Sequence, residues 1–296
     1  MDSLNTTKWP KLVVVTGLDI HYLIGNQFQD PFPQKIPLEG YYGLTWNKDG
    51  LFLGGRFAVT IISKNSDVIQ HLAFTRERNG LHQILFYEDY LYAVATGTNF
   101  LDKIDPHTKQ VQSVDLHPEK TNNKDDSSDW SHINSVFAKD GKLYVVHHNF
   151  HQPSYITVLD LDLNILKQIN DVGQQNHNVY VDDNTLYTLS SLTSEVVKLN
   201  LKTKKKEVVK IGGTIEGLED DITYLRGFAK SKDHFVFGIT HSHGRDERDT
   251  VQSYLLLYDN DLNFVDKMII PKTGQVREVR LIEETDYAHN QMRFPL

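Results

Sequence analysis

Short apolar stretches separated by polar turns run along nearly the whole chain, and one arrangement of them recurs. Each copy has a polar residue, an apolar stretch, a turn with Asp, Asn or Gly, and a doublet such as Leu-Tyr that opens a second apolar stretch. The copies read YGLTWNKDGLFLGG from Tyr42, HQILFYEDYLYAVA from His82, HINSVFAKDGKLYVVH from His132, HNVYVDDNTLYTLS from His177 and RGFAKSKDHFVFGI from Arg226. The pattern predicts paired strands, and no window has the 3.6-residue period of a long helix.

The spacing of the doublets sets the size of the repeating unit. They begin at Leu51, Leu91, Leu143, Leu186 and Phe235, in steps of 40, 52, 43 and 49 residues. A third apolar stretch follows each doublet and ends at a turn that suits a hairpin into an outer strand. Steps of this length match one four-stranded propeller blade. The chain is therefore expected to be all-β, a single β-propeller domain spanning residues 1–296.

Two strand-like segments lie outside these copies, residues 11–15 near the N-terminus and 276–282 near the C-terminus. Pairing the chain ends in one blade would close the ring and remove exposed sheet edges. We therefore expect six four-stranded blades, the last shared by the two termini, with five blades as the alternative. The polar segment 119–130 is expected to be a surface loop that enters the third blade.

Composition excludes several kinds of chemistry. The chain has no cysteine, so a thiolate nucleophile, an iron–sulfur cluster and a Cys-containing zinc site are excluded. A net charge of −8 argues against a nucleic-acid partner, and the basic run 202–206 is expected to be a solvated hairpin turn. Gly-x-Ser-x-Gly elbows and Gly-rich phosphate loops are absent from the sequence.

The chain is expected to be soluble and cytoplasmic, with no membrane partner. Residues 1–8 lack the basic start and apolar core of a signal peptide, and no apolar run approaches the roughly 20 residues that span a bilayer. The sequence leaves the oligomeric state open.

The 14 histidines are the first indication of chemistry. In a propeller the first strand of each blade lines the central channel, so residues at the start of those strands converge at the channel mouth. His82, His132 and His177 hold this position in consecutive blades. They predict a mononuclear site for a transition metal (Fe, Cu, Zn or Mn) with open positions for substrate or water. An anion-binding or acid–base role and simple hydrogen bonding within the protein are the alternatives.

Arg226 occupies the same position in the fifth blade. A buried guanidinium needs an anionic partner, which could be Glu278 of the closing blade or the carboxylate or phosphate of a small anionic substrate. Asn134 and Asn178 are expected to orient substrate or water, and Tyr42 to donate a hydrogen bond. The sequence thus favours a metal-dependent enzyme, with a non-catalytic ligand-binding or protein-binding propeller as the alternative from another class.

Other polar residues carry less specific indications. His147, His148 and His151 follow one second strand, and His241 and His243 follow another, where loops approach the same face or the rim. Paired carboxylates of a glycosidase would have to come from Asp129, Glu39 and Glu278, which no spacing singles out.

The repeats resemble the six-bladed propellers of the sugar-lactonase, strictosidine-synthase and NHL-repeat group, over nearly the whole chain. The resemblance implies an axial calcium ion on a Glu, two Asn and an Asp, with Glu39, Asn134 and Asn178 matching three of those positions, and a lactonase-like hydrolysis. The fourth position is Arg226-Gly227 and not an Asp, a departure that argues against lactone hydrolysis. The run from Tyr224 to Phe228 also resembles bacterial propeller proteins of unassigned activity.

Overall fold

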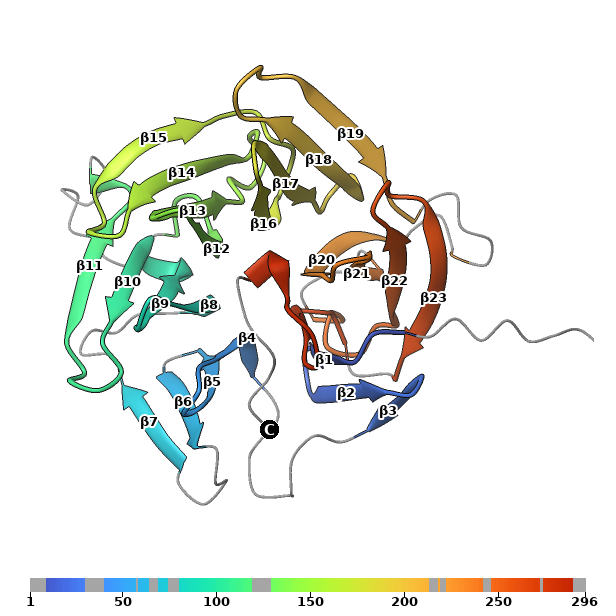
Figure 1. Cartoon of the computed structure of the whole chain (residues 1–296), viewed down its shortest axis with the longest axis horizontal. Helices are drawn as coiled ribbons and strands as arrows, with labels where there is room; N and C mark the ends of the chain where they lie inside the picture. Colours follow the sequence, from blue (N-terminus) through green and yellow to red (C-terminus); the bar gives the residue numbers. More distant parts are fainter. Residues whose placement is uncertain are drawn as a thin grey trace, which may run out of the picture.

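Six antiparallel sheets of four strands surround one axis in the computed structural model (Figure 1). The structure describes residues 9–29, 40–56, 58–63, 69–73, 80–118, 129–212, 218, 222–241, 246–271 and 274–289. This arrangement confirms the six-bladed β-propeller. Residues 119–128 of the predicted surface loop lie outside the described residues.

Each blade runs outward from the axis through strands that are consecutive in the sequence, except in the closing blade. The innermost strands are β4 (Tyr41–Trp46), β8 (Leu81–Tyr87), β12 (Ile133–Lys139), β16 (His177–Asp182), β20 (Ile222–Lys230) and β24 (Glu278–Leu281). The second strands are β5 (Gly50–Gly55), β9 (Tyr90–Ala95), β13 (Lys142–His147), β17 (Thr185–Ser190), β21 (His234–His241) and β1 (Leu12–Val15). The third strands are β6 (Ala58–Ser63), β10 (Phe100–Ile104), β14 (Tyr155–Asp160), β18 (Glu195–Asn200), β22 (Ser253–Asp259) and β2 (Ile20–Ile24). The outermost strands are β7 (Ile69–Ala73), β11 (Val111–Asp115), β15 (Ile165–Ile169), β19 (Lys206–Lys210), β23 (Phe264–Ile270) and β3 (Gln27–Gln29).

The closing blade joins the two ends of the described chain. Strand β24 pairs with β1 in antiparallel register, from Val15 opposite Glu278 to Leu12 opposite Leu281. The innermost strand of this blade therefore comes from the C-terminal side and its other strands from the N-terminal side, which confirms the predicted closure.

Strands near the axis are more buried than strands at the rim, and their sequences are correspondingly more apolar. Inner strand β12 (INSVFAK) is buried along almost its whole length, whereas outer strand β15 (ILKQI) is mostly exposed. Strands buried on both faces need apolar residues on both sides, which explains the near-continuous apolar stretches near each blade start. The basic run 202–206 is exposed between β18 and β19, as expected for a solvated hairpin.

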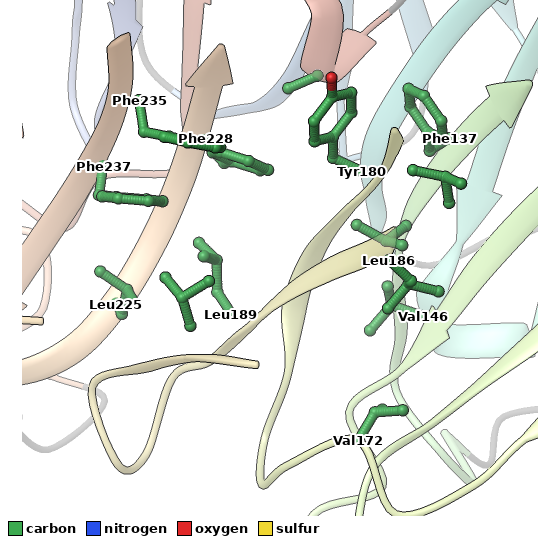
Figure 2. Close-up of a cluster of buried hydrophobic side chains, with 14 of the residues drawn as sticks. Phe137, Val146, Val172, Tyr180, Leu186, Leu189, Leu225, Phe228, Phe235 and Phe237 are labelled. Carbon is green, nitrogen blue, oxygen red and sulfur yellow. The ribbon is translucent and has the colours of Figure 1, made fainter. Parts of the chain in front are cut away.

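Aromatic side chains at equivalent places in adjacent inner strands hold neighbouring blades together (Figure 2). The Phe137 and Tyr180 rings are 5.7 Å apart between centroids, and Tyr180 and Phe228 are 6.0 Å apart, both edge to face. Edge-to-face contacts of this kind add to the free energy of burial. The inner strands are therefore set firmly around the axis, which matters for any site that they carry.

One end of the axis is covered by the C-terminal part of the described chain. The short 3-10 helix η2 (Tyr287–His289) contacts β12, β16 and β20 near the centre of the ring (Figure 1). The His289 Nε2–H donates to the carbonyl of Phe228 at 2.7 Å. The Asp286 carboxylate accepts hydrogen bonds from the backbone N–H groups of Lys230, Leu281 and Ala288. These contacts lie on the face of the propeller where the inner strands finish. A candidate site is therefore expected on the opposite face, where the inner strands begin.

The helical elements that lie wholly within the described residues are η2 and a second 3-10 turn, η1 (Thr96–Thr98), and Pro118, at the edge of a described range, is also helical. Within those residues no helix has the length and apolar character that crossing a membrane requires.

Candidate functional site

Polar and aromatic side chains gather at the axial end where the inner strands begin, and we call this group the mouth. It consists of Tyr42, His82, His132, His148, His177, Tyr224, Arg226 and Arg277. Of the predicted site residues, the structure therefore brings Tyr42, the three histidines and Arg226 together, and adds residues that the repeat did not identify.

A β-bulge interrupts strand pairing near the start of five inner strands. These bulges position the polar residues that the repeat predicted at the mouth. The residues left out of the pairing are Tyr42 in β4, His82 and Gln83 in β8, Asn134 in β12, Asn178 in β16, and Arg226 and Gly227 in β20. A bulge bends the strand locally and re-aims the side chain of the extra residue. The repeat thus encodes the same local irregularity in blade after blade, and its polar anchors are bulge residues or their neighbours.

The histidine rings at the mouth form a continuous row from blade to blade. The centroid distance is 4.9 Å between His82 and His132, 5.1 Å between His132 and His148, and 5.5 Å between His148 and His177. His148 therefore lies between two of the predicted metal ligands. Among the described residues, no group of three or more His, Asp or Glu side chains is arranged to hold a metal ion.

His132 is held by a carboxylate. Its Nδ1 lies 2.5 Å from Asp129 Oδ2, and its backbone N–H donates to Asp129 Oδ1 at 2.7 Å. An ionised carboxylate only accepts, so Nδ1 carries a proton, and the neutral ring then has its lone pair on Nε2. The left-handed backbone of His132, with φ of 52°, is the conformation that lets both contacts form. A carboxylate-held imidazole of this kind is the usual form of a general base.

His148 has the opposite tautomer. The backbone N–H of Phe150 donates to His148 Nδ1 at 3.1 Å, so this nitrogen is an acceptor and the proton of the neutral ring is on Nε2. No protein acceptor for this Nε2–H occurs in the described part of the chain. His148 therefore presents a hydrogen-bond donor at the mouth.

His177 returns to the tautomer of His132. Its Nδ1 lies 3.1 Å from the carbonyl of Gln175 and 2.9 Å from Ser191 Oγ. The Ser191 hydroxyl donates to the carbonyl of Leu225 at 2.5 Å, so both neighbours accept from Nδ1–H. The Nε2 lone pair of His177 is consequently free and without a donor among the described residues.

Burial keeps three rings of this row, His82, His148 and His177, neutral. Desolvation, with Coulombic repulsion from Arg226 and the neighbouring rings, lowers the pKa of His148 to about 3 and holds the pKa values of His82 and His177 well below the ordinary range. At physiological pH these rings are hydrogen-bonding groups without charge, and the positive charge of the mouth resides on its arginines.

Acidification is expected to destabilise the fold through the same groups. Unfolded imidazoles take up protons near pH 6.5, whereas His148 stays neutral to about pH 3, so its stabilisation is present above 6.5 and is lost as the pH falls toward 3. We expect His148→Gln to flatten the pH dependence of unfolding free energy between pH 7 and 5 by about 1 kcal/mol per pH unit. Urea unfolding across that range measures this. The exposed His107, changed to Gln, is the control and is expected to leave the slope intact; equal slopes for His148→Gln and wild type would contradict the expectation.

Arg226 is the most unusual group at the mouth. Its residue is 7% exposed, and burial lowers its pKa to about 10, yet no acceptor for the guanidinium occurs in the described residues. Glu278, the internal partner considered from the sequence, instead accepts from Gln83 at 3.1 Å and forms an ion pair with Arg280 at 3.5 Å. Within the part of the chain that the structure describes, the guanidinium of Arg226 is thus a buried donor that no carboxylate contacts directly.

Arg277 supplies a second cation next to it. Its guanidinium carbon lies 4.0 Å from the centroid of the Tyr42 ring, and its N–H groups donate to the carbonyl of Tyr41 and to Asp249. The Tyr42 ring also stacks on His82, with centroids 5.1 Å apart. Tyr42 therefore links the second cation to the histidine row, and its predicted role as a hydrogen-bond donor stays a prediction.

Asn134 and Asn178 use their amides inside the protein. Asn134 Nδ2–H donates to the carbonyl of Asn176, and its Oδ1 accepts from the Ser135 hydroxyl. Asn178 Oδ1 accepts from the backbone N–H of Gly227 at 3.0 Å. These bonds tie the bulges of adjacent blades together, and a catalytic role for either amide stays a prediction.

The same contacts bear on the calcium site that the resemblance implies. The side-chain oxygens of Asn134 and Asn178 already accept hydrogen bonds, and the cation Arg226 lies in the blade where the fourth ligand would be. Glu39 lies outside the described residues. The described residues of this set therefore do not fit a calcium ion, which prefers free carboxylate and carbonyl oxygens.

A second buried histidine pair lies away from the mouth. Ser131 Oγ is 2.7 Å from His117 Nε2 and 2.8 Å from His147 Nδ1, and His147 Nε2 is 2.9 Å from Thr157 Oγ1. Both nitrogens of His147 are thus used internally. Because side chains alternate along a strand, His147 points into the blade while its neighbour His148 reaches the mouth.

Sequence reasoning missed the roles of His148, Arg277 and Tyr224 at the mouth. Backbone bonds from the N–H groups of His148 and Asn149 to the carbonyls of His132 and Ser131 bring the second strand alongside the first, which no inner-strand repeat could show. Arg277 could have been found by aligning the closing blade with the others, since it directly precedes Glu278 at the start of β24.

Comparison with known proteins gives the fold but no family. No protein-family model and no curated protein sequence matches the chain. A chain of a nidogen–laminin complex superposes with a TM-score of 0.67 at 10% identity, covering 92% of this chain and 98% of that one. A protein of unknown function from Bacteroides caccae has the same TM-score and coverage at 13% identity. A virginiamycin B lyase from Staphylococcus aureus superposes with a TM-score of 0.53 at 11% identity, covering 78% of this chain and 84% of the lyase.

These likenesses agree with the predicted resemblance to six-bladed propellers. At such low identities they extend to the architecture alone, because one propeller fold carries many unrelated functions. They show the fold of this chain and not its function.

Proposed function

We propose that the mouth binds a small anionic molecule and that Arg226 pairs with its carboxylate or phosphate. The observation that carries this proposal is the buried guanidinium without an acceptor in the described residues. A buried charge without a partner costs several kcal/mol, so its position is best explained by an anion that arrives from solution. The planar guanidinium suits a carboxylate or phosphate because it can donate two parallel hydrogen bonds.

The contacts at the mouth support a single anionic group. Asp249 is paired with Arg277, Asp129 is hydrogen-bonded to His132, and the histidines with lowered pKa values are neutral. Arg226 is the cation whose guanidinium no described carboxylate contacts. A carboxylate or a phosphodiester would neutralise it, and a ligand cation would be repelled.

His132 gives the mouth a means of catalysis. With its Nδ1–H bonded to Asp129, its free Nε2 can take a proton from an O–H of the bound molecule or of water, and the carboxylate stabilises the imidazolium that forms. Arg226 would fix the anionic end of the molecule while this proton moves. The proposal is therefore an enzyme with an arginine anchor and a histidine base.

A transition metal is the second candidate, because His132 and His177 share one feature with metal-ligating histidines. Each donates Nδ1–H to an oxygen and leaves Nε2 free. A metal would take these two nitrogens together with groups from the ligand or water. Elemental analysis of untagged protein distinguishes the candidates: one equivalent of a transition metal would favour this second one, and substoichiometric metal favours the anion site.

Anion binding is tested by ligand-induced thermal stabilisation followed by calorimetry. Small carboxylates and phosphate monoesters are compared with their neutral amide and alcohol counterparts. We expect one or more anions to stabilise the wild type, their neutral counterparts to have no effect, and Arg226→Gln to weaken anion binding by about tenfold or more, as loss of a charge-assisted hydrogen bond does.

The exposed Lys202 provides the charge-matched control, since Lys202→Gln removes one positive charge far from the mouth. Equal affinity in the wild type and Arg226→Gln would overturn the proposal. His132→Gln is expected to keep Arg226-dependent binding while abolishing turnover of a bound molecule. Binding without turnover in the wild type would instead make the protein a non-catalytic binding propeller.

A further inference from the structure

The hydrogen bonds behind the histidine rings determine what their free nitrogens can do. Protons are placed by the partners of Nδ1: Asp129 for His132, the Phe150 N–H for His148, and the Gln175 carbonyl for His177. The mouth therefore presents acceptor, donor and acceptor in sequence along the row, followed by the donor Arg226. This order is a chemical pattern that a ligand has to match.

The two acceptors require a donor from the ligand. The free lone pairs of His132 and His177 meet no donor in the described residues, and the histidines with lowered pKa values do not gain protons of their own near neutral pH. An ammonium group could donate to them, but Arg226 and Arg277 make the mouth unfavourable for a cation. Neutral O–H or N–H groups remain.

Because the donor His148 lies between these two acceptors, the ligand groups that fit the rings are hydroxyl groups. His148 lies 5.1 Å from the His132 ring and 5.5 Å from the His177 ring, measured between centroids, and offers its Nε2–H to an oxygen. A hydroxyl can donate to one of the outer rings and at the same time accept from His148, whereas an amide N–H can only donate. Two hydroxyls thus satisfy the free nitrogens of His132, His148 and His177.

We infer that the ligand is a polyhydroxylated anion: a small molecule with a carboxylate or phosphate for Arg226 and two hydroxyl groups for His132, His148 and His177. This inference rests on the proposed anion site and specifies its substrate class. The hydroxyl at His132 is the one whose proton the histidine–aspartate pair can accept. Plain carboxylates and alkyl phosphates of the same length lack the matching hydroxyls and bind through Arg226 alone.

The test compares matched pairs of anions by isothermal titration calorimetry with the full chain. Propanoate is paired with glycerate, and propyl phosphate with glycerol 3-phosphate, so the two pairs also separate carboxylate from phosphate. We expect the hydroxylated member of the preferred pair to bind about tenfold more tightly or better, as two added hydrogen bonds allow. His177→Phe should reduce this advantage severalfold, while His107→Phe, which alters an exposed histidine, should preserve it.

The outcomes separate the two proposals. Equal affinities within both pairs, with binding that still depends on Arg226, would overturn the inference about hydroxyl groups and leave the anion site standing. Binding that is insensitive to Arg226→Gln would overturn the anion site itself. Should His177→Phe fail to fold, nitrogen NMR of the histidines decides: we expect the proton on Nδ1 of His177 and on Nε2 of His148, and the reverse assignment would overturn the inference.

Discussion

Arg226→Met is expected to make the protein more stable in the absence of ligand and unable to bind anions. The guanidinium is desolvated, its pKa is lowered by burial, and no hydrogen-bond acceptor among the described residues compensates its charge. Methionine has similar length and no charge. Replacement of buried ion pairs by apolar side chains of similar volume is often neutral or stabilises proteins by about 1–4 kcal/mol, and we expect removal of this single buried charge to give a gain of that order.

Urea or thermal unfolding with and without an anionic ligand measures both effects. The wild type should be the less stable protein without ligand and should gain stability when the anion is added, whereas Arg226→Met should not respond to it. A loss of stability in the variant without ligand would show that the guanidinium has a structural partner, and this would contradict its assignment as a ligand anchor.

The same substitution at Arg280 is expected to have the opposite sign. Arg280 is fully buried, forms an ion pair with Glu278 and donates to the carbonyl of Ile84. Arg280→Met would leave the Glu278 carboxylate buried without its cation, and breaking a buried pair in this way costs about 3–5 kcal/mol. Burial already raises the pKa of Glu278, so the loss should be largest at high pH, where the carboxylate is ionised.

Removing the carboxylate as well is the control for this second prediction. Glu278→Gln combined with Arg280→Met should recover much of the lost stability, because neither charge is then left alone. A double variant as unstable as Arg280→Met would mean that the loss comes from packing and not from charge. The two arginines thus test one principle. An arginine that is paired within the protein stabilises the fold, whereas an arginine whose partner is a ligand destabilises the fold when the ligand is absent.

The repeat predicted the architecture well because every blade is built from the same short-range sequence features. Doublets such as Leu91 and Leu143 open the second strands, and the Asp- and Gly-containing turns before them set the hairpins. These are short-range features, readable one blade at a time. Closure by the termini followed from the need to remove sheet edges, and the pairing of β24 with β1 confirms it.

The site was predictable only in part, since it depends on irregularities and on contacts between strands. Tyr42, His82, His177 and Arg226 were found because each stands nine residues before its doublet, and His132 because it stands two residues before the equivalent position, Asn134. Tautomers and partners could not be found this way. That His148 separates His132 from His177 depends on pairing between β12 and β13, and that Glu278 belongs to Arg280 depends on packing at the axis.

The central claim is that Arg226 pairs with an anion from solution, and a crystal structure grown with selenate tests it most directly. Selenate resembles phosphate in shape, and its selenium is located by anomalous scattering. We predict an anomalous peak at the mouth with selenate oxygens within hydrogen-bond distance of the Arg226 guanidinium, and no such peak in Arg226→Met. An Arg226 guanidinium bonded to a protein carboxylate or carbonyl, with no selenate beside it, would contradict the account.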